Sequence, residues 1–152
     1  MRRMERTGGT TTLSRQQRGQ LLGACPLFQG IGTSHLERLV DRAIEVEFPA
    51  DRVIARQGEI GTGFFVIVSG RVRVVRDGQI LAQLGPGEFF GELSLLDRQP
   101  RVAQVVAEQP TTCLALPSWD FEQLLLEEPA LTVSILRGIA NRLRAVTEQH
   151  LH

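Results

Sequence analysis

Hydrophobic positions follow three successive patterns along the chain, and each change of pattern marks a change of predicted structure. From residue 14 to about residue 43 apolar side chains recur at helical spacing, as Leu36, Leu39 and Val40 do. Between Ile44 and Pro117 the pattern alternates in short runs that glycine-rich turns separate. The helical period then returns. This order predicts a mainly β fold with flanking helices: an antiparallel eight-stranded β-roll of jelly-roll type, with an N-terminal helix and two C-terminal helices.

The alternating region contains short runs that are typical of strands in a β-sandwich or barrel. Between two of them Asp77-Gly78 predicts a two-residue hairpin turn, because both residues tolerate a positive φ. The predicted strands are Ile44–Phe48, Arg52–Ala55, Gly63–Val68, Arg71–Val75, Gln79–Leu84, Ala103–Ala107 and Thr112–Leu116.

Capping residues and an apolar stripe define the predicted helices. Thr33 or Ser34 is expected to cap a helix that runs to about Ala43, with Glu37 closing a capping box with Ser34. Ser118 is expected to cap a short helix that ends near residue 129. We expect Trp119 to anchor this short helix on the roll. A longer helix then runs to about residue 149. Its stripe should pack chiefly on the roll, with its distal part against a second copy of the chain. The stripe consists of Leu131, Ile135, Leu136, Ile139, Leu143 and Val146.

Length, charge and cysteine content narrow the class of protein. The 152 residues suit one domain, and no apolar run is long enough to span a membrane. Residues 1–18 hold five arginines against a single glutamate, and we interpret them as a flexible tail that precedes a domain over residues 19–152. The formal net charge of zero argues against nucleic-acid binding by the chain as a whole. Two cysteines and the lack of a signal segment at the start predict a cytoplasmic protein.

The stretch from residue 89 to residue 103 contains the residues that suggest a ligand site. Gly91 lets a ligand approach the backbone at the start of one helical turn, whose first amide groups have no internal partners and can bind an anion. Pro100 ends that turn, so the chain can double back and place Arg101 beside its start. A guanidinium and several free N–H groups form a phosphate receptor. Glu92 beside a phosphate is tolerable only where it faces a hydroxyl donor such as a ribose 2′-OH.

Two segments of this stretch, Phe90-Gly91-Glu92-Leu93-Ser94-Leu95 and Pro100-Arg101-Val102-Ala103, resemble the phosphate-binding cassette of cyclic nucleotide-binding domains. Such domains occur in catabolite activator protein and in the regulatory subunits of protein kinase A. The resemblance implies that backbone amides near Gly91, Leu93 and Ser94 hold the cyclic phosphate. It also implies that Arg101 pairs with an exocyclic phosphate oxygen and that Glu92 accepts a hydrogen bond from the ribose 2′-OH.

The residue after the arginine bears on the choice of nucleotide. In this family a threonine at that position commonly favours cGMP, because its hydroxyl bonds the guanine. Val102 offers only a backbone N–H there. We therefore expect the ligand to be cAMP, with cGMP as the second candidate.

The base of the nucleotide should lie in an apolar slot of the β-roll. Val74 and Leu84 are the expected walls of this slot. The resemblance further implies that residues of the last helix cap the base and the ribose, and Arg142, Val146 and Thr147 stand at the corresponding positions.

The sequence argues against catalysis and against a metal or other cofactor. A metal-dependent β-barrel enzyme needs clustered histidines on its strands, whereas His35, His150 and His152 all lie outside the alternating region. Ser94 has no histidine nearby in the sequence to activate it.

Two functions therefore remain. In the first, a cyclic nucleotide enters the cassette and repositions the C-terminal helix. In the second, Glu92 and Arg101 pair with each other in a nucleotide-free fold that serves as a protein interaction module. DNA-binding regulators of this family carry a helix-turn-helix after the long helix, and here the sequence stops at His152, so the chain is either a free-standing module or a fragment.

Overall fold

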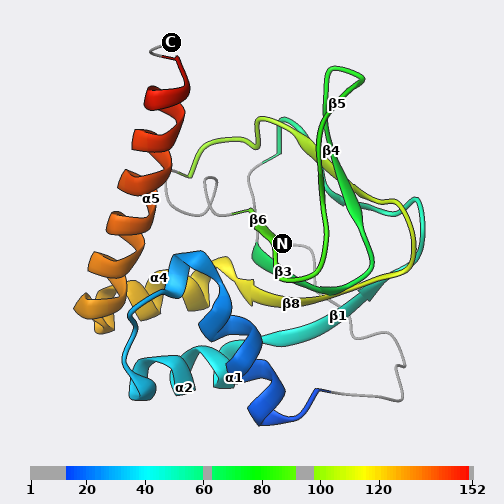
Figure 1. Ribbon diagram of the computed structural model, residues 1–152. Helices are drawn as coiled ribbons and strands as arrows, with labels where there is room; N and C mark the ends of the chain where they lie inside the picture. The colour runs from blue at the N-terminus through cyan, green and yellow to red at the C-terminus, as the bar shows by residue number, and fades with distance from the viewer. Residues whose placement is uncertain (1–12, 60–62, 92–97, 151–152) are drawn as a thin grey trace.

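The computed structural model describes residues 13–59, 63–91 and 98–150, whose strands form a β-roll of two antiparallel sheets (Figure 1). One sheet has the order β1-β8-β3-β6 and the other has the order β2-β7-β4-β5. The predicted fold class is confirmed. The strands are β1 (Ile44–Phe48), β2 (Val53–Ala55), β3 (Gly63–Ser69), β4 (Val72–Arg76), β5 (Gln79–Leu84), β6 (Phe89–Phe90), β7 (Gln104–Ala107) and β8 (Thr111–Pro117).

The strand predictions agree with the structure to within one residue at each end. The Asp77-Gly78 hairpin is also confirmed, since Arg76 pairs with Gln79 and the two turn residues have φ values of 50° and 82°. The pattern did not separate β6, Phe89–Phe90, because two residues are too few to show an alternation.

Strand β3 lies between two hydrophobic cores. Its side chains alternate across the sheet: Phe64 and Val66 belong to a core shared with the helices, whereas Phe65 and Ile67 belong to the interior of the roll. Both faces of β3 are therefore buried, which explains its nearly continuous apolar sequence.

Phe64 is the centre of the core beneath the helices. Its ring lies 5.7 Å from that of Phe28, 5.6 Å from that of Phe89 and 5.9 Å from that of Phe121, measured between ring centroids. Because these partners come from a 3₁₀ turn, a strand and a helix, this one ring joins the helical elements to the sheet.

The helices gather on the outer side of the sheet that contains β1, β8 and β3 (Figure 1). They bury one face of that sheet and leave the edge strand β5 of the other sheet exposed to solvent. The helical elements are α1 (Arg15–Ala24), the 3₁₀ turn η1 (Pro26–Phe28), α2 (Thr33–Arg42), α4 (Ser118–Glu127) and α5 (Pro129–His150).

Helix α1 begins where the helical pattern starts, but this point lies inside the range that we assigned to a flexible tail. Ser14 caps it in a capping box with Gln17, whose amide oxygen accepts the Ser14 N–H at 2.8 Å. The Leu13 N–H donates to the buried carboxylate of Glu45 at 2.8 Å, so the chain is attached to β1 before the helix starts. The boundary at residue 18 is therefore too late for the described part of the tail, and residues 1–12 lie outside the described residues.

Two other expected caps were wrong. The N-cap of α2 is Gly32 and that of α4 is Pro117, and neither helix start has a side-chain cap. Thr33 and Ser118 are already helical, whereas a capping side chain must stand on the extended residue before the helix.

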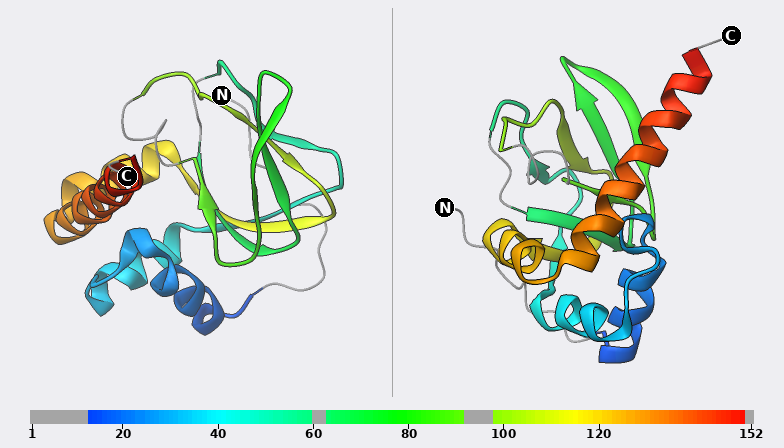
Figure 2. Two further views of the ribbon diagram at one scale, coloured as in Figure 1. Left: turned by 45° about the horizontal axis from the view of Figure 1, so that its top comes forward. Right: turned by 90° about the vertical axis from the view of Figure 1, so that its left-hand side faces the viewer.

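The C-terminal helices expose more apolar surface than we expected. Leu131 and Ile135 are buried, but Leu136, Leu143 and Val146 are 60%, 66% and 51% exposed. The first part of α5 packs on η1 and α4, and the rest stands apart from the roll (Figure 2). Leu136 therefore departs from the prediction that the stripe packs chiefly on the roll, whereas Leu143 and Val146 belong to the distal part that we did not assign to the roll. Trp119 does not anchor α4 either, because its side chain is 58% exposed.

Both cysteines, Cys25 and Cys113, are buried thiols, and burial raises the pKa of the Cys113 thiol to about 12. Within the three described ranges, no helix combines the length and apolar character needed to cross a membrane. The same ranges contain no group of three or more side chains placed to bind a metal ion.

Candidate ligand site at the roll

Gly91 follows β6 directly and lies against the first residues of β3. A Cβ at this position would be 2.6 Å from the Gly63 carbonyl oxygen and 3.5 Å from the Phe64 Cα, and the φ of Gly91 is +96°. We predicted that a glycine here admits a ligand. The structure adds a second reason, because only glycine combines this backbone conformation with so close an approach to β3.

The backbone of Arg101 is held by hydrogen bonds to a turn between β2 and β3. The Arg101 N–H donates to the Glu59 carbonyl at 2.7 Å, and the Gly58 N–H donates to the Arg101 carbonyl at 2.8 Å. Arg101 thus faces two consecutive residues of the turn, as in a β-bulge. These hydrogen bonds set the point from which the Arg101 side chain extends.

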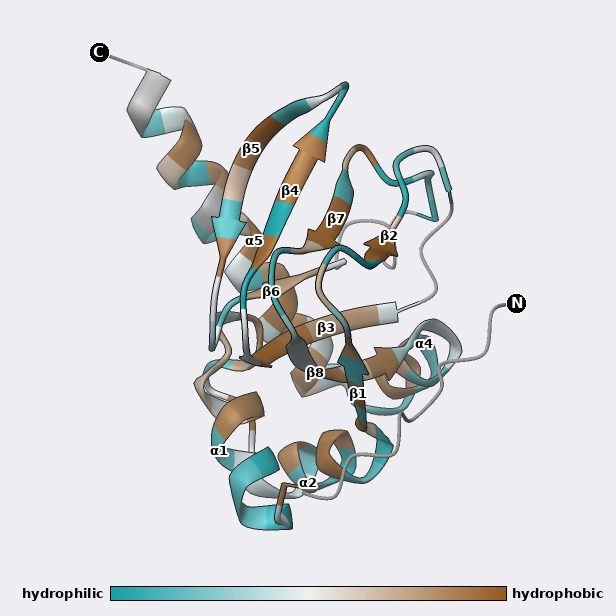
Figure 3. Ribbon diagram, turned by 90° about the vertical axis from the view of Figure 1, so that its right-hand side faces the viewer, coloured by the Kyte–Doolittle hydropathy of each residue, from teal (hydrophilic) through white to brown (hydrophobic). Residues whose placement is uncertain are grey.

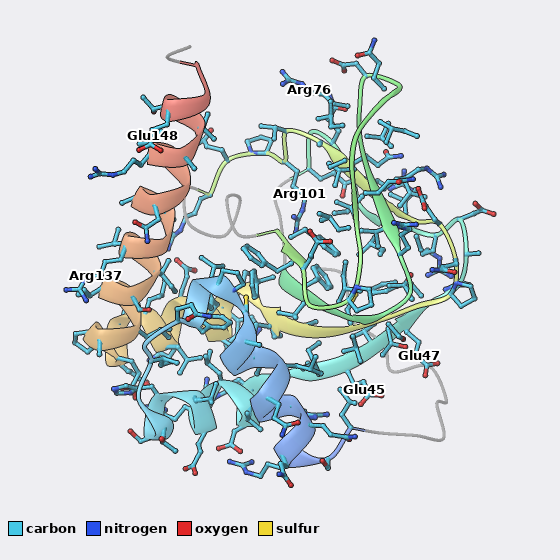
Figure 4. All side chains as sticks on the ribbon, in the orientation of Figure 1. Glu45, Glu47, Arg76, Arg101, Arg137 and Glu148 are labelled. Atoms are coloured by element: carbon cyan, nitrogen blue, oxygen red, sulfur yellow. The ribbon has the colours of Figure 1, made fainter. Side chains whose placement is uncertain are left out.

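The Arg101 side chain is half-buried and reaches from this point toward β3 and β6 (Figure 4). Its Nη2 donates to the Gly63 carbonyl at 3.0 Å, and its Nη1 lies 3.2 Å from the position that a Cβ of Gly91 would occupy. The prediction that the chain doubles back to place Arg101 beside the start of the cassette agrees with these distances. The guanidinium faces the roll and not bulk solvent.

The middle of the cassette lies outside the described residues. Glu92, Leu93 and Ser94 belong to this segment, residues 92–97, so their roles remain predictions. At its far end Arg98 has a φ of +56°, and its guanidinium binds Glu122 of α4, with a distance of 3.1 Å from Nε to Oε1. The described ends of the cassette are thus attached to β3 on one side and to α4 on the other.

Val74 and Leu84 occupy the positions expected of an apolar wall. Leu84 pairs with Val72 across the β4–β5 hairpin, and Val74 lies two residues further along β4, so all three face the same side of the sheet. Val74 and Leu84 are half-buried and pack against the core inside the roll, and Figure 3 shows the apolar residues of this hairpin. Phe90 belongs to the same core, which places this wall and Gly91 at one cluster.

The remaining predicted residues are not gathered at this cluster. The Val102 side chain is 63% exposed, so it does not narrow the interior of the roll. Thr147 is exposed and donates to the Leu143 carbonyl of its own helix at 2.8 Å, and Val146 is exposed as well. Arg142 stands on the same distal part of α5, but its side chain is outside the described set. Because this part of α5 stands apart from the roll (Figures 1 and 2), the predicted cap over the base is not formed in this structure.

Sequence reasoning missed the residues that support Arg101. The Gly63 carbonyl and the turn of Gly58 and Glu59 act through main-chain atoms, which any residue type supplies. Only the glycine at position 58, with its φ of +86°, was a signal that a tight turn lies there.

Comparison with known proteins places these features in a family. Residues 45–128 match the family model of the cyclic nucleotide-binding domain. That range holds the strands of the roll, Gly91, Arg101 and the wall of the hairpin. The chain therefore belongs to the cyclic nucleotide-binding domain family.

Several relatives carry this domain within different proteins. A cyclic nucleotide-gated potassium channel of Rhizobium etli is 39% identical over 124 residues, which cover 81% of this chain and 34% of the channel. The cyclic AMP receptor protein of Thermus thermophilus is 36% identical over 124 residues, covering 78% of this chain and 57% of the receptor. The chain thus spans about a third of the channel and just over half of the receptor.

A solved structure has the same fold over nearly its whole length. The N-terminal domain of a transcriptional regulator from Streptomyces coelicolor A3(2) is 30% identical, with a TM-score of 0.71. The match covers 84% of this chain and 94% of that one.

Gly91→Ala should destabilise the fold, because its Cβ would collide with the Gly63 carbonyl and alanine is strained at this φ. We expect a loss of about 2–3 kcal/mol in the free energy of unfolding, measured by urea denaturation. Gly85→Ala is the matched control, since no atom lies within 4 Å of its added Cβ, and it should change stability by less than about 0.5 kcal/mol. Equal stability of the two variants would contradict the described contact with β3.

Proposed function

We propose that the chain is a cytoplasmic, non-catalytic sensor domain that binds a cyclic nucleotide. The observation that carries this proposal is the half-buried Arg101 guanidinium, which the Gly63 carbonyl orients beside Gly91. A guanidinium presents paired N–H donors to a phosphate. Val74 and Leu84 supply apolar surface for a base on the same side of the roll.

The cassette residues outside the described ranges complete this proposal. Backbone amides near Leu93 and Ser94 hold the cyclic phosphate together with that of Gly91. Glu92 accepts a hydrogen bond from the ribose 2′-OH. The described residue at the start of the segment, Gly91, lies beside the Arg101 side chain and supports this part of the proposal.

We infer that cAMP is preferred to cGMP. Val102 provides no hydroxyl for a guanine, and the Thermus thermophilus relative is named a cyclic AMP receptor protein. An adenine needs no such donor in an apolar slot.

Arg101→Ala should weaken cAMP binding about 10- to 150-fold, the range that corresponds to losing one charged hydrogen bond. Isothermal titration calorimetry of the purified chain with cAMP and with cGMP measures both the loss and the preference. Arg137→Ala is the matched control, because Arg137 points outward from α5, away from the roll (Figure 4).

The possible outcomes separate the candidate functions. Tighter binding of cGMP would overturn the preference for cAMP. If the wild-type chain bound neither nucleotide, the sensor proposal would fail and the nucleotide-free interaction module would replace it.

We further propose that ligand binding repositions α5. The ion pair between Arg98 and Glu122 supports this proposal, because it links the far end of the cassette to α4. α4 ends at Glu127 and α5 begins at Pro129, so a displacement of α4 changes the direction of α5. A ligand that binds one arrangement better than the other then shifts the population between them.

In this proposal α2, α4 and α5 move as one rigid unit, because ion pairs join α2 to α4 and to the residue between α4 and α5. Arg38 binds both Glu127 and Glu128, and Arg42 binds the buried Asp120 at 3.0 Å. Two of these carboxylates are nearly buried, so breaking the pairs would expose unpaired charge to a partly apolar environment. The helices should therefore move together.

Saturating cAMP should change the distance between α5 and the roll, and Glu122→Gln should reduce that change, because it removes the charge that binds Arg98. Spin labels on Arg71→Cys and Arg144→Cys allow the distance to be measured by pulsed electron paramagnetic resonance, since both native cysteines are buried. The matched control is Glu148→Gln, which makes the same substitution at a glutamate of α5. A distance distribution that cAMP leaves unchanged would contradict the proposed movement.

We also propose that the distal part of α5 pairs with a second copy of the chain. Leu136, Ile139, Leu143 and Val146 recur at spacings of three and four residues, and three of them are more than half exposed. This spacing is the apolar seam of a two-stranded coiled coil.

Leu143→Glu should convert a dimer to a monomer, because it places a charge in the seam. Sedimentation velocity measures the change, and Leu126→Glu on the exposed face of α4 is the control that should leave the dimer intact. A wild-type chain that sediments as a monomer at high concentration would remove this part of the proposal.

A further inference from the structure

The turn at residues 56–59 contacts two separate parts of the proposed ligand site. Its ends are joined by a hydrogen bond from the Glu59 N–H to the Arg56 carbonyl at 3.3 Å, and Gly58 at its third position has a φ of +86°. These values describe a type II turn. The turn thus has a defined shape, and its second residue, Gln57, projects from it.

The first contact of this turn is with the phosphate side of the site. Glu59 and Gly58 form the paired backbone hydrogen bonds with Arg101, at 2.7 Å and 2.8 Å. The turn therefore fixes the position of the Arg101 backbone relative to the start of β3.

The second contact is with the hairpin that carries the apolar wall. The Gln57 Nε2 donates to the Asp77 Oδ1 at 2.9 Å, and the Asp77 N–H donates to the Gln57 Oε1 at 3.2 Å. This reciprocal pair uses both ends of the amide, so it sets orientation as well as distance. Asp77 is the first residue of the turn that joins β4, which carries Val74, to β5, which carries Leu84.

These side-chain bonds are not needed to form the hairpin. β4 already pairs with β5 on one side and with β7 on the other, and the Asp77-Gly78 turn adopts its positive φ values within that ladder. Both bonds between Gln57 and Asp77 are exposed to solvent, where a hydrogen bond adds little to global stability. Their effect is on the relative position of the hairpin and the turn.

We propose that Gln57 is a positioning residue for the ligand, which holds the apolar wall of the hairpin at a fixed place relative to Arg101. This inference rests on the proposed function, because it assumes that one ligand contacts both parts. A nucleotide that bridges its phosphate and base sites gains affinity when the two sites are held at the correct separation before it binds. The Gln57 side chain supplies that constraint without touching the ligand.

A ligand-free experiment tests the mechanical part of this proposal. Gln57→Ala should accelerate amide hydrogen exchange at Asp77, because the Asp77 N–H loses its acceptor. It should also accelerate exchange at Arg101, because the turn that binds the Arg101 backbone becomes less restrained. NMR measures the exchange of both amides. The matched control is Gln83→Ala, which removes an exposed glutamine hydrogen bond to Glu108 at 2.8 Å elsewhere on the hairpin. Unchanged exchange at Arg101 in Gln57→Ala would overturn the coupling.

A titration with cAMP tests the consequence for binding. Gln57→Ala should weaken cAMP binding about fivefold, the change that one ordinary hydrogen bond represents, with no shift of the thermal unfolding midpoint beyond that of Gln83→Ala. Asp77→Gly should lose a similar amount, because it keeps the turn and removes the acceptor. Asp77→Asn should retain wild-type affinity, because it keeps the acceptor and the backbone N–H.

The results distinguish the failure of this inference from failure of the proposed function. If the wild-type chain binds cAMP and Gln57→Ala binds it equally well, the positioning role is refuted and the sensor assignment stands. If affinity and unfolding midpoint fall together, Gln57 has a merely structural role and the inference is also refuted. If the wild-type chain does not bind cAMP or cGMP, the sensor assignment and the positioning role both fail.

Discussion

The site depends on one crowded backbone crossing, where Gly91 and Arg101 meet the first residue of β3. The Gly63 carbonyl accepts the Arg101 guanidinium at 3.0 Å and leaves no room for a Cβ at Gly91. Three segments that are far apart in the sequence therefore share one carbonyl group. A half-buried cation would be costly without such an acceptor, so the crossing both stabilises the guanidinium and gives it a direction.

β3 separates this crossing from the helices, and its packing on both faces argues against a signal that passes through the sheet. One face of β3 contributes Phe64 to the core beneath the helices, and the other contributes Phe65 to the interior of the roll. A close-packed sheet of this kind deforms little. The proposed signal from ligand to helices would therefore pass around the sheet, where the ion pair of Arg98 with Glu122 joins the far end of the cassette to α4.

The sequence pattern of the strands was sufficient to predict the roll. A strand buried on one face alternates apolar and polar residues, a strand buried on both faces is apolar throughout, and such runs recur along this part of the chain. The Asp77-Gly78 turn was predicted for a local reason, since few residue pairs tolerate two positive φ values. Helix starts were harder. Ser14 and Gln17 formed a capping box that the sequence contained and we did not use, whereas Ser118 is a good capping residue that stands one position too late.

The site was predictable only where side-chain chemistry defines it. Gly91 and Arg101 have roles that no other residue type fills well, and both lie where the cassette pattern predicted. The support of Arg101 by Glu59 and Gly58 uses main-chain atoms, so no residue pattern reveals it. The exposure of Leu136 was not predicted, because a helical stripe shows which residues share a face and not how far the neighbouring elements extend along it.

The length of α5 has a mechanical consequence. At about 1.5 Å per residue, its 22 residues form a rod of roughly 33 Å that is packed near one end only. When α4 and α5 turn together by about 10°, the far tip of this rod moves some 6 Å relative to its packed end, by the geometry of a rigid rod of that length. A movement of α5 that is too small to disturb the packing of Leu131 at its packed end therefore becomes, at its far end, larger than the width of a side chain.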